Sequence, residues 1–310
     1  MGWYIVRRVL QGIPVFFGST FIIFAMVFAM PGNPILRMFG DRTPSEAQIA
    51  ALEAKFHLDQ DFFTRYFLYL GDVLTGNLGT TYAGQSVNEI LARTFPVTLR
   101  LALMAVIIQL LVGVLAGLIS GLRKGGIFDH ATLIVTLLLI SIPVFVLAFV
   151  SQWFFGIELG WVRPTVGQGA PWQDLILPAF VLAALNLAYV VRLTRGSVIE
   201  TEQMDFTRMA YGKGLPRRRV IPTHILRNSL IPVTTSLAAD FGILIVGATV
   251  TEAVFNVPGV GNELFHAINR HDLPEIVSIV TILVIVYVFV NLLIDLLYGV
   301  LDPRIRYVKK

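Results

Sequence analysis

The chain carries six long apolar stretches separated by polar segments. They cover residues 9–30, 97–122, 131–157, 175–191, 232–255 and 276–300. A helix of about 20 apolar residues crosses the roughly 30 Å hydrocarbon core of a bilayer. The pattern predicts an all-α membrane protein with six transmembrane helices, and an even number of crossings places both termini on one side.

Composition agrees with this pattern. Hydrophobic residues make up 55% of the 310 residues, charged residues only 14%, and the mean hydropathy is +0.74, unlike a soluble globular chain. The first stretch follows Arg7 and Arg8 as a signal peptide would. It is longer than the apolar core of about 7–15 residues in such peptides, so we expect a retained membrane anchor.

Basic residues gather on the side that holds the termini. They include Arg7 and Arg8, Arg123 and Lys124, much of the segment 192–231, and the C-terminal tail, whereas the acidic residues there are few: Asp129, Glu200, Glu202, Asp205 and Asp302. Short cytoplasmic loops are enriched in Lys and Arg. That side is therefore predicted to be cytoplasmic.

Residues 31–96 form the longest connection on the opposite side. The segment 43–46 (Thr-Pro-Ser-Glu) fits a capping box with proline at the first helical position, and Ile49, Leu52 and Phe56 then fall on one face. We expect an amphipathic helix across the outer mouth. It would be either a packed extracytoplasmic cap or a contact for a substrate-binding partner.

The polar excursion 192–231 is the longest segment on the cytoplasmic side. It contains Ala210, Gly212 and Gly214, followed by 216–219 (Pro-Arg-Arg-Arg). Because glycine and proline interrupt helices, we expect a short helix, broken near Gly214 and the proline, that projects as a knob. From composition alone, docking of a protein partner and contact with anionic lipid both remain open.

Small residues and prolines mark contacts and bends within the apolar stretches. Gly113, Gly117 and Gly121 recur every four residues, the spacing that lets two helix backbones approach closely. The partner helix stays open at this point. Pro143 and Pro178 fall within the third and fourth stretches, where each is expected to kink its helix.

Asp240 and Glu252 lie in the fifth apolar stretch. An ionised side chain there costs at least about 2.5 kcal/mol, so neither should face lipid. Asp240 would line a substrate pathway or link two helices, and Glu252, near the outer end, would serve a gate or anchor a loop. Proton coupling would need a relay of such groups, and scattered acids without an intramembrane His or Lys make a poor one.

Motifs for catalysis are missing from the sequence. There is no Gly-x-x-x-x-Gly-Lys-Ser/Thr loop, no His-Glu-x-x-His and no Gly-x-Ser-x-Gly, so we expect neither ATP hydrolysis nor protease or lipase activity from this chain. The chain has no cysteine, and its five histidines lack the spacing of metal ligands. We expect no metal, no other cofactor and no nucleic-acid partner.

The cytoplasmic stretch 205–215 (Asp-Phe-Thr-Arg-Met-Ala-Tyr-Gly-Lys-Gly-Leu), continuing to 224–232 (His-Ile-Leu-Arg-Asn-Ser-Leu-Ile-Pro), resembles the EAA loop of bacterial ABC importers. Over nearly its whole length the chain is similar to the B-type permease subunit of dipeptide and oligopeptide importers. Further matching pieces are 31–34 (Pro-Gly-Asn-Pro), 76–79 (Gly-Asn-Leu-Gly), 252–255 (Glu-Ala-Val-Phe), 258–261 (Pro-Gly-Val-Gly), 291–298 (Asn-Leu-Leu-Ile-Asp-Leu-Leu-Tyr) and 302–306 (Asp-Pro-Arg-Ile-Arg). Their order and spacing make the resemblance specific.

The resemblance implies half of a type I importer in a bacterial cytoplasmic membrane, with both termini cytoplasmic. Residues 1–30 would hold the cytoplasmic N-terminus and first transmembrane helix, 31–96 the extracytoplasmic cap, and 97–310 a five-helix permease core with a coupling loop at about 192–231. The implied partners are a homologous second permease, two cytoplasmic ATPase subunits that use ATP and Mg²⁺, an extracytoplasmic peptide-binding protein and the lipid membrane.

In the family, the loop forms a coupling helix seated in a groove of the ATPase. The resemblance puts this helix at about 205–219 and assigns coupling to Asp205, Arg208, Ala210, Gly212, Lys213, Gly214, Leu215 and Arg217. Asp240 and Glu252 are assigned to the translocation pathway. The sequence departs from the general motif at Arg208, where the motif has Glu, and at Arg227, where it has Pro.

The resulting hypothesis is a transmembrane permease subunit of an ATP-driven importer of di- and oligopeptides. An importer of nickel complexes or another small solute would have the same architecture. A proton-coupled carrier would need inverted repeats and relay residues, and a signalling or scaffold protein would leave the coupling-type loop unexplained.

Overall fold

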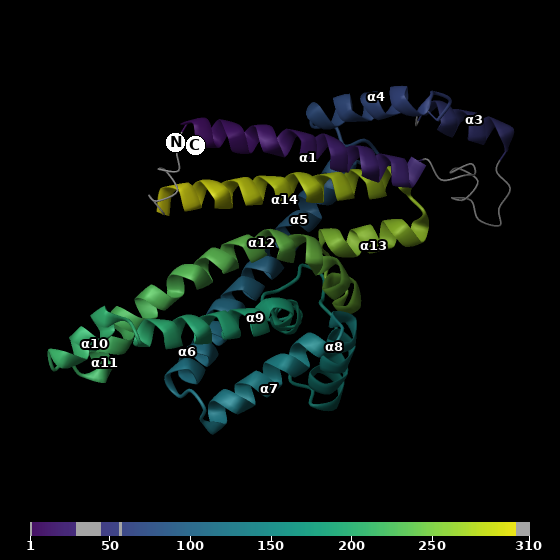
Figure 1. Ribbon diagram of the computed structural model, residues 1–310. Helices are drawn as coiled ribbons and strands as arrows, with labels where there is room; N and C mark the ends of the chain where they lie inside the picture. The colour runs from purple at the N-terminus through teal and green to yellow at the C-terminus, as the bar shows by residue number, and fades with distance from the viewer. Residues whose placement is uncertain (1, 29–44, 56–57, 302–310) are drawn as a thin grey trace. The chain divides into compact units, whose positions relative to one another are not determined.

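The computed structural model describes residues 2–28, 45–55 and 58–301 (Figure 1). In chain order the helical elements are α1 (Gly2–Phe28), α3 (Glu46–Lys55), α4 (Phe62–Leu74), α5 (Val87–Ile108), η1 (Gln109–Gly113), α6 (Val114–Leu122), α7 (Ile127–Ser141), α8 (Val144–Ser151), η2 (Gln152–Glu158), α9 (Ile176–Glu202), α10 (Asp205–Gly212), α11 (Arg217–Val220), η3 (Ile221–Leu226), α12 (Arg227–Phe255), α13 (Val260–Arg270) and α14 (Leu273–Leu301). The elements written η are π-helices. The predicted all-α fold is confirmed for these residues.

The helices supply the predicted number of membrane crossings. Four segments are long and apolar enough by themselves: Val6–Phe28, Val87–Leu122, Arg217–Phe255 and Leu273–Ile294. Two bent pairs meet the same criterion, Ile127–Ser141 with Val144–Glu158 at 107° and Ile176–Ala184 with Asn186–Glu202 at 60°. Counting each bent pair as one span gives six.

The two predicted proline kinks have different outcomes. Pro143 lies between α7 and α8, at the 107° break, so the bend expected there is confirmed. The kink expected at Pro178 is wrong, because Pro178 lies in the first turn of α9. Backbone N–H groups in a first turn have no partner within the helix, so proline disrupts nothing there. The bend of this helix comes later, between Ala184 and Asn186.

The chain divides into two compact units. The first comprises Met1–Thr98 together with Pro258–Lys310, and the second comprises Leu99–Val257. One boundary falls inside α5, and the other follows α12.

In the first unit, α1 and α14 lie side by side although they come from opposite ends of the chain (Figure 1). Phe24 of α1, Tyr66 of α4 and Val277 of α14 are buried together in one cluster. The Tyr69 hydroxyl donates to Thr281 Oγ1 at 2.7 Å, and burial raises the pKa of Tyr69 to about 12. These contacts join both ends of the chain through α4.

Two short helices of this unit were not predicted. α4 lies within the expected cap, and the Asp61 carboxylate caps it by accepting from the backbone N–H groups of Phe63 and Thr64, both at 3.1 Å. α13 follows α12 and is held to α14 through Arg270, which donates to Glu263 at 2.7 Å and to Glu275 at 3.1 Å.

The structure has a helix in the predicted cap, α3, which begins at Glu46. Thr43, Pro44 and Phe56, on which that prediction also drew, lie outside the described residues. Farther along the connection, the Tyr82 backbone N–H donates to the Asp272 carboxylate at 2.8 Å. Burial of Asp272 raises its pKa.

The second unit is organised around α9. This helix packs against α6, α7, α8 and α12 (Figure 1). Its buried side chains point to several sides of the helix and include Leu182, Ala188, Val191 and Val198. α9 is therefore an internal helix, and its C-terminal end leads directly into α10.

Candidate functional site

The segment between α9 and α12 is a broken helix. α10 ends at Gly212, and the chain then turns at Gly214, whose φ of +78° is in the left-handed region that glycine adopts readily. Pro216 precedes α11, which runs through η3 into α12. The predicted interruption near Gly214 and Pro216 is thus present in the structure.

The inner face of α10 is packed against α9 and η3. Ala210 is 5% exposed and lies in a buried cluster with Val198, Val220 and Ile225, and Leu215 packs against this cluster. The small side chain of Ala210 therefore allows α10 to pack closely against α9 and η3 of the same chain. Of the coupling residues suggested by the sequence, Ala210 and Leu215 belong to this inner face.

Hydrogen bonds fix the same helix to the end of α9. The Thr207 hydroxyl donates to the Thr201 carbonyl at 2.8 Å, and both residues are buried. Ser229, in the first turn of α12, donates to the Ser197 carbonyl at 3.2 Å. The ends of α9, α10 and α12 are thereby joined by polar as well as apolar contacts.

The outer face of the segment carries the remaining predicted residues. Asp205, Arg208, Gly212, Lys213, Gly214 and Arg217 are all exposed. Between them stand two apolar side chains that the sequence analysis did not single out, Phe206 at 38% and Met209 at 59% exposure. Residues three apart are neighbours on a helix surface, so these two form one apolar patch among charged groups.

A buried ion pair stands beside this segment. The Arg195 guanidinium of α9 contacts Asp129 of α7 through two hydrogen bonds, from Nε at 2.5 Å and from Nη2 at 2.8 Å. Asp129 is 2% exposed and also accepts from Ser120 of α6 and from the backbone N–H of Gly125. Such a bidentate, fully hydrogen-bonded pair is the geometry in which a buried charge is tolerated.

The three glycines of the second span meet α9 of the same chain, which identifies their partner helix. A Cβ atom on Gly117 would lie 2.6 Å from both Thr194 Cβ and the Val191 carbonyl oxygen. Cβ atoms on Gly113 and Gly121 would similarly lie 2.7 Å from side chains of α9. This glycine seam joins α6 to α9 at backbone distance.

Gln109 adds a polar contact above the seam. It is fully buried in η1, and its Nε2 donates to the Ala183 carbonyl at 3.0 Å. Ala183 adjoins the point where the two halves of α9 diverge by 60°. A π-helical turn in one helix and a bend in its neighbour are thus joined by one amide group.

The two acids predicted for the pathway both lie on α12 but are not brought together. Their separation along the helix is about 18 Å, at 1.5 Å per residue. Asp240 is partly buried, and its Oδ2 has no hydrogen-bond partner among the described residues. Glu252 is fully buried near the end of the helix. In the described part of the chain, no group of three or more His, Cys, Asp or Glu residues is arranged to hold a metal ion.

Two family models match the chain. The model for the binding-protein-dependent transport system inner membrane component matches residues 113–307, and the N-terminal model of such membrane components matches residues 1–102. The chain belongs to this family. It is therefore a type I ABC permease and a multi-pass protein of the inner membrane.

Relatives of this permease match over nearly its full length. The dipeptide transport system permease protein of Escherichia coli (strain K12) is 36% identical, with 99% of each chain covered. The corresponding protein of Alkalihalophilus pseudofirmus is 34% identical over 98% of this chain and 99% of its own. The di/tripeptide transport system permease protein of Pseudomonas aeruginosa is 34% identical over 98% of both.

Sequence reasoning missed several residues that organise the permease. The alternation of buried Thr207 and Ala210 with exposed Phe206 and Met209 is a helical period that could have revealed the apolar patch. No sequence pattern indicated a role for Asp129, because its partner Arg195 is distant in sequence and both residues were interpreted as loop charges.

Proposed function

We propose that this chain is the permease subunit of an ATP-driven importer of di- and oligopeptides. The cargo assignment is supported by the three relatives above, which are named for dipeptide or di/tripeptide transport. ATP and Mg²⁺ are used by two cytoplasmic ATPase subunits. A homologous second permease and an extracytoplasmic peptide-binding protein complete the transporter, and both termini of this chain lie in the cytoplasm.

The single observation that carries the coupling role is the exposed apolar patch of Phe206 and Met209 on an anchored helix. Exposed apolar side chains outside the membrane mark protein interaction surfaces, and a few central apolar anchors dominate binding energy. Arg208 and Lys213 beside the patch complement an acidic rim on a partner. The patch therefore fits a groove on an ATPase subunit better than a lipid surface.

Coupling residues divide into two roles in this proposal. Asp205, Arg208, Gly212, Lys213, Gly214 and Arg217 present the docking surface, whereas Ala210 and Leu215 hold it against α9. Because α10 is packed on the end of α9, a movement of the ATPase subunits is passed to that helix. The Asp129–Arg195 ion pair and the glycine seam then carry it to α7 and α6.

The proposed pathway includes Asp240. Its Oδ2 is buried without a partner among the described residues, and such a group is costly unless a donor arrives. The protonated amino terminus of a peptide is a donor of the right charge. Glu252, fully buried near the far end of α12, would anchor the outer part of the pathway.

The test is peptide uptake by the purified transporter in proteoliposomes. We expect ATP-dependent uptake of labelled di- and tripeptides by the wild type. Met209→Glu should weaken association with the ATPase subunits by about 2 kcal/mol or more, roughly thirtyfold, because it places a charge on an interface anchor. Uptake should fall with it, while the amount of membrane-inserted chain stays unchanged.

A matched control is Phe265→Glu. Phe265 is an apolar residue of α13 with 47% exposure, and α12 crosses the membrane between α10 and α13. This variant should retain the ATPase subunits. Wild-type coupling in Met209→Glu would contradict the docking role, whereas ATPase stimulation by a metal chelate but not by peptide would contradict only the cargo.

A further inference from the structure

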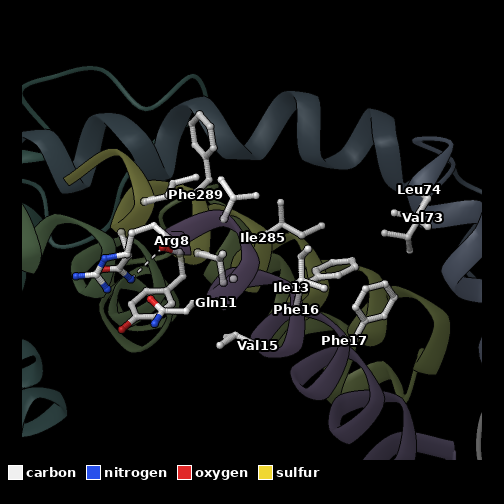
Figure 2. Close-up of a pocket in the computed structure, with 16 residues that line it drawn as sticks. Arg8, Gln11, Ile13, Val15, Phe16, Phe17, Val73, Leu74, Ile285 and Phe289 are labelled. Carbon is white, nitrogen blue, oxygen red and sulfur yellow. Dashed lines mark hydrogen bonds between the residues drawn. The ribbon is translucent and has the colours of Figure 1, made fainter. Parts of the chain in front are cut away.

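A crevice of about 720 Å³ runs along α1 and α14 in the first unit (Figure 2). Ile13, Phe17 and Phe289 in its walls are each more than 40% exposed. Exposed apolar side chains are expected on a membrane-spanning helix, where lipid or another helix covers them, and they select no particular occupant. A stronger demand for a partner lies in the second unit, in the side-chain amide of Gln109.

The amide of Gln109 is only half satisfied. The residue is fully buried, and its Nε2 donates to the Ala183 carbonyl of α9 at 3.0 Å. Its Oε1 is buried too and accepts no hydrogen bond from the described residues. A buried acceptor without a partner carries its full desolvation penalty. A second state of the permease in which a donor reaches Oε1 would therefore be stabilised.

The bend of α9 separates two parts of the helix that are held differently. After the bend, the glycine seam holds residues 186–202 against α6, and α10 packs on their end. Before it, Ala179, Ala183 and Ala184 are buried with small side chains. A displacement of α10 moves the second part together with α6, so the bend must absorb it, as hinges do.

The neighbouring helix is irregular where it meets this bend. The π-helical turn η1 separates α5 from α6, and such turns are frequent at functional sites. Gln109 is the first residue of that turn, and its hydrogen bond reaches the last residues before the bend. The amide thus joins the two places at which α9 and its neighbour depart from regular α-helix.

Asn186 is the donor best placed for Gln109 Oε1. It is the first residue after the bend and three positions from Ala183, and residues three apart are neighbours on a helix surface. Asn186 is partly buried, and its side-chain amide forms no hydrogen bond within the described part of the chain. A change of the bend shifts this amide relative to the Ala183 carbonyl, to which Gln109 is bonded.

We propose that Gln109 is a positioning residue that couples the bend of α9 to the transport cycle. In the described state its Nε2 holds the Ala183 carbonyl, and in the ATP-bound state its Oε1 accepts a hydrogen bond from Asn186 Nδ2. The second bond favours a straighter α9 and passes the displacement of α10 to the first part of the helix. The inference rests on the proposed ATP-driven cycle but not on the identity of the cargo.

The first test measures the bend by electron paramagnetic resonance. This chain has no cysteine, so spin labels can be attached at Ile176→Cys and Glu200→Cys, two exposed positions on opposite sides of the bend, in a transporter whose other subunits lack cysteine. Their Cα atoms would be about 36 Å apart in a straight helix and about 31 Å apart at the 60° bend. We expect the longer distance to be populated when ATP is trapped with vanadate. Asn186→Leu, which keeps the volume but removes the donor, should lower the ratio of the longer to the shorter distance at least about fivefold.

The second test measures peptide uptake per ATP hydrolysed in proteoliposomes. Gln109→Met keeps the length of the side chain without its amide and should lower this ratio about fivefold or more. Asn186→Leu should lower it similarly in the wild type but less than about twofold in Gln109→Met, because the two residues share one bond. Thr136→Val is the control, since Thr136 is buried and its hydroxyl bonds only within its own helix, to the Leu133 carbonyl. It should keep the wild-type ratio.

Three results would overturn the proposal. An unchanged label distance after ATP is trapped in the wild type would remove the hinge. Lower thermal stability of Gln109→Met, with label distances and uptake ratio as in the wild type, would reduce Gln109 to a static link between helices. A wild-type uptake ratio in Asn186→Leu would exclude Asn186 as the donor. Absence of peptide uptake by the wild type, with the ATP-dependent distances intact, would refute the cargo and leave this inference standing.

Discussion

Replacing Gly117 by alanine tests the glycine seam most directly. The added Cβ would meet Thr194 Cβ and the Val191 carbonyl oxygen, each at 2.6 Å, and the Arg195 backbone nitrogen at 3.1 Å. Non-bonded carbon atoms rest at about 3.5–4.0 Å. Since two of the three neighbours are backbone atoms, no side-chain rotation can relieve the clash, and α6 and α9 must separate locally.

The magnitude follows from two opposing effects. Overpacking a well-packed contact costs about 1–3 kcal/mol, and a clash with backbone belongs to the upper part of that range. Alanine in place of glycine within a helix stabilises the helix by about 1 kcal/mol. We therefore expect Gly117→Ala to lower the free energy of unfolding by about 1–2 kcal/mol.

Gly196→Ala provides the matched control, at a glycine of α9 that lies outside the contact. Gly196 lies within α9, and a Cβ there would meet nothing within 4 Å. The gain in helix propensity is common to both variants. The difference between their free energies of unfolding, about 2–3 kcal/mol, therefore measures the clash alone. Thermal unfolding of the purified transporter should separate their midpoints by roughly 4–12 °C.

If Gly117→Ala and Gly196→Ala have the same free energy of unfolding, α6 and α9 can separate at no cost and the glycine seam is loosely packed. A further variant, Gly117→Val, should be less stable than Gly117→Ala, because its added methyl groups enlarge the same clash.

Three further predictions concern the remaining parts of the site. Asp129→Ala and Arg195→Ala should each destabilise the permease by about 3–5 kcal/mol, and the double variant should cost clearly less than their sum in thermal unfolding; additive losses would dismiss the ion pair. Ala210→Leu should overpack the base of α10 by about 1–3 kcal/mol and reduce peptide-driven ATPase activity, and wild-type activity in this variant would count against an anchored helix. Asp240→Asn should lower uptake of peptides with a free amino terminus about tenfold or more, from loss of a charge-assisted bond, and spare N-acetylated peptides; equal loss for both would remove the amino terminus as its partner.

Much of the fold could be predicted because membrane-spanning helices consist of long apolar runs. Four spans, and six when each bent pair is counted as one, follow from length and hydropathy, and the break after α10 follows from Gly214 and Pro216. α4 and α13 escaped because they are short helices inside segments read as connections.

The candidate site could be predicted only in part, for a different reason. The glycine spacing predicted a close contact between helices, but the helix that faces the glycines could be identified only from the three-dimensional packing. The same holds for Asp129, whose partner Arg195 lies on another helix, and for Gln109, whose acceptor is a backbone carbonyl. Local sequence encodes helices and breaks, whereas pairing between distant helices depends on shape that no single segment contains.

The packing of α1 has a consequence for synthesis of the chain. α1 contacts α4, which follows it closely, and α14, which comes about 250 residues later and emerges roughly 12–50 s afterwards at 5–20 residues per second. During that interval α4 is the neighbour available to α1 within its unit, and the contact between Tyr66 and Thr20 at 3.1 Å can form at once. The short helix α4 can thus pack against α1 until α14 has been synthesised.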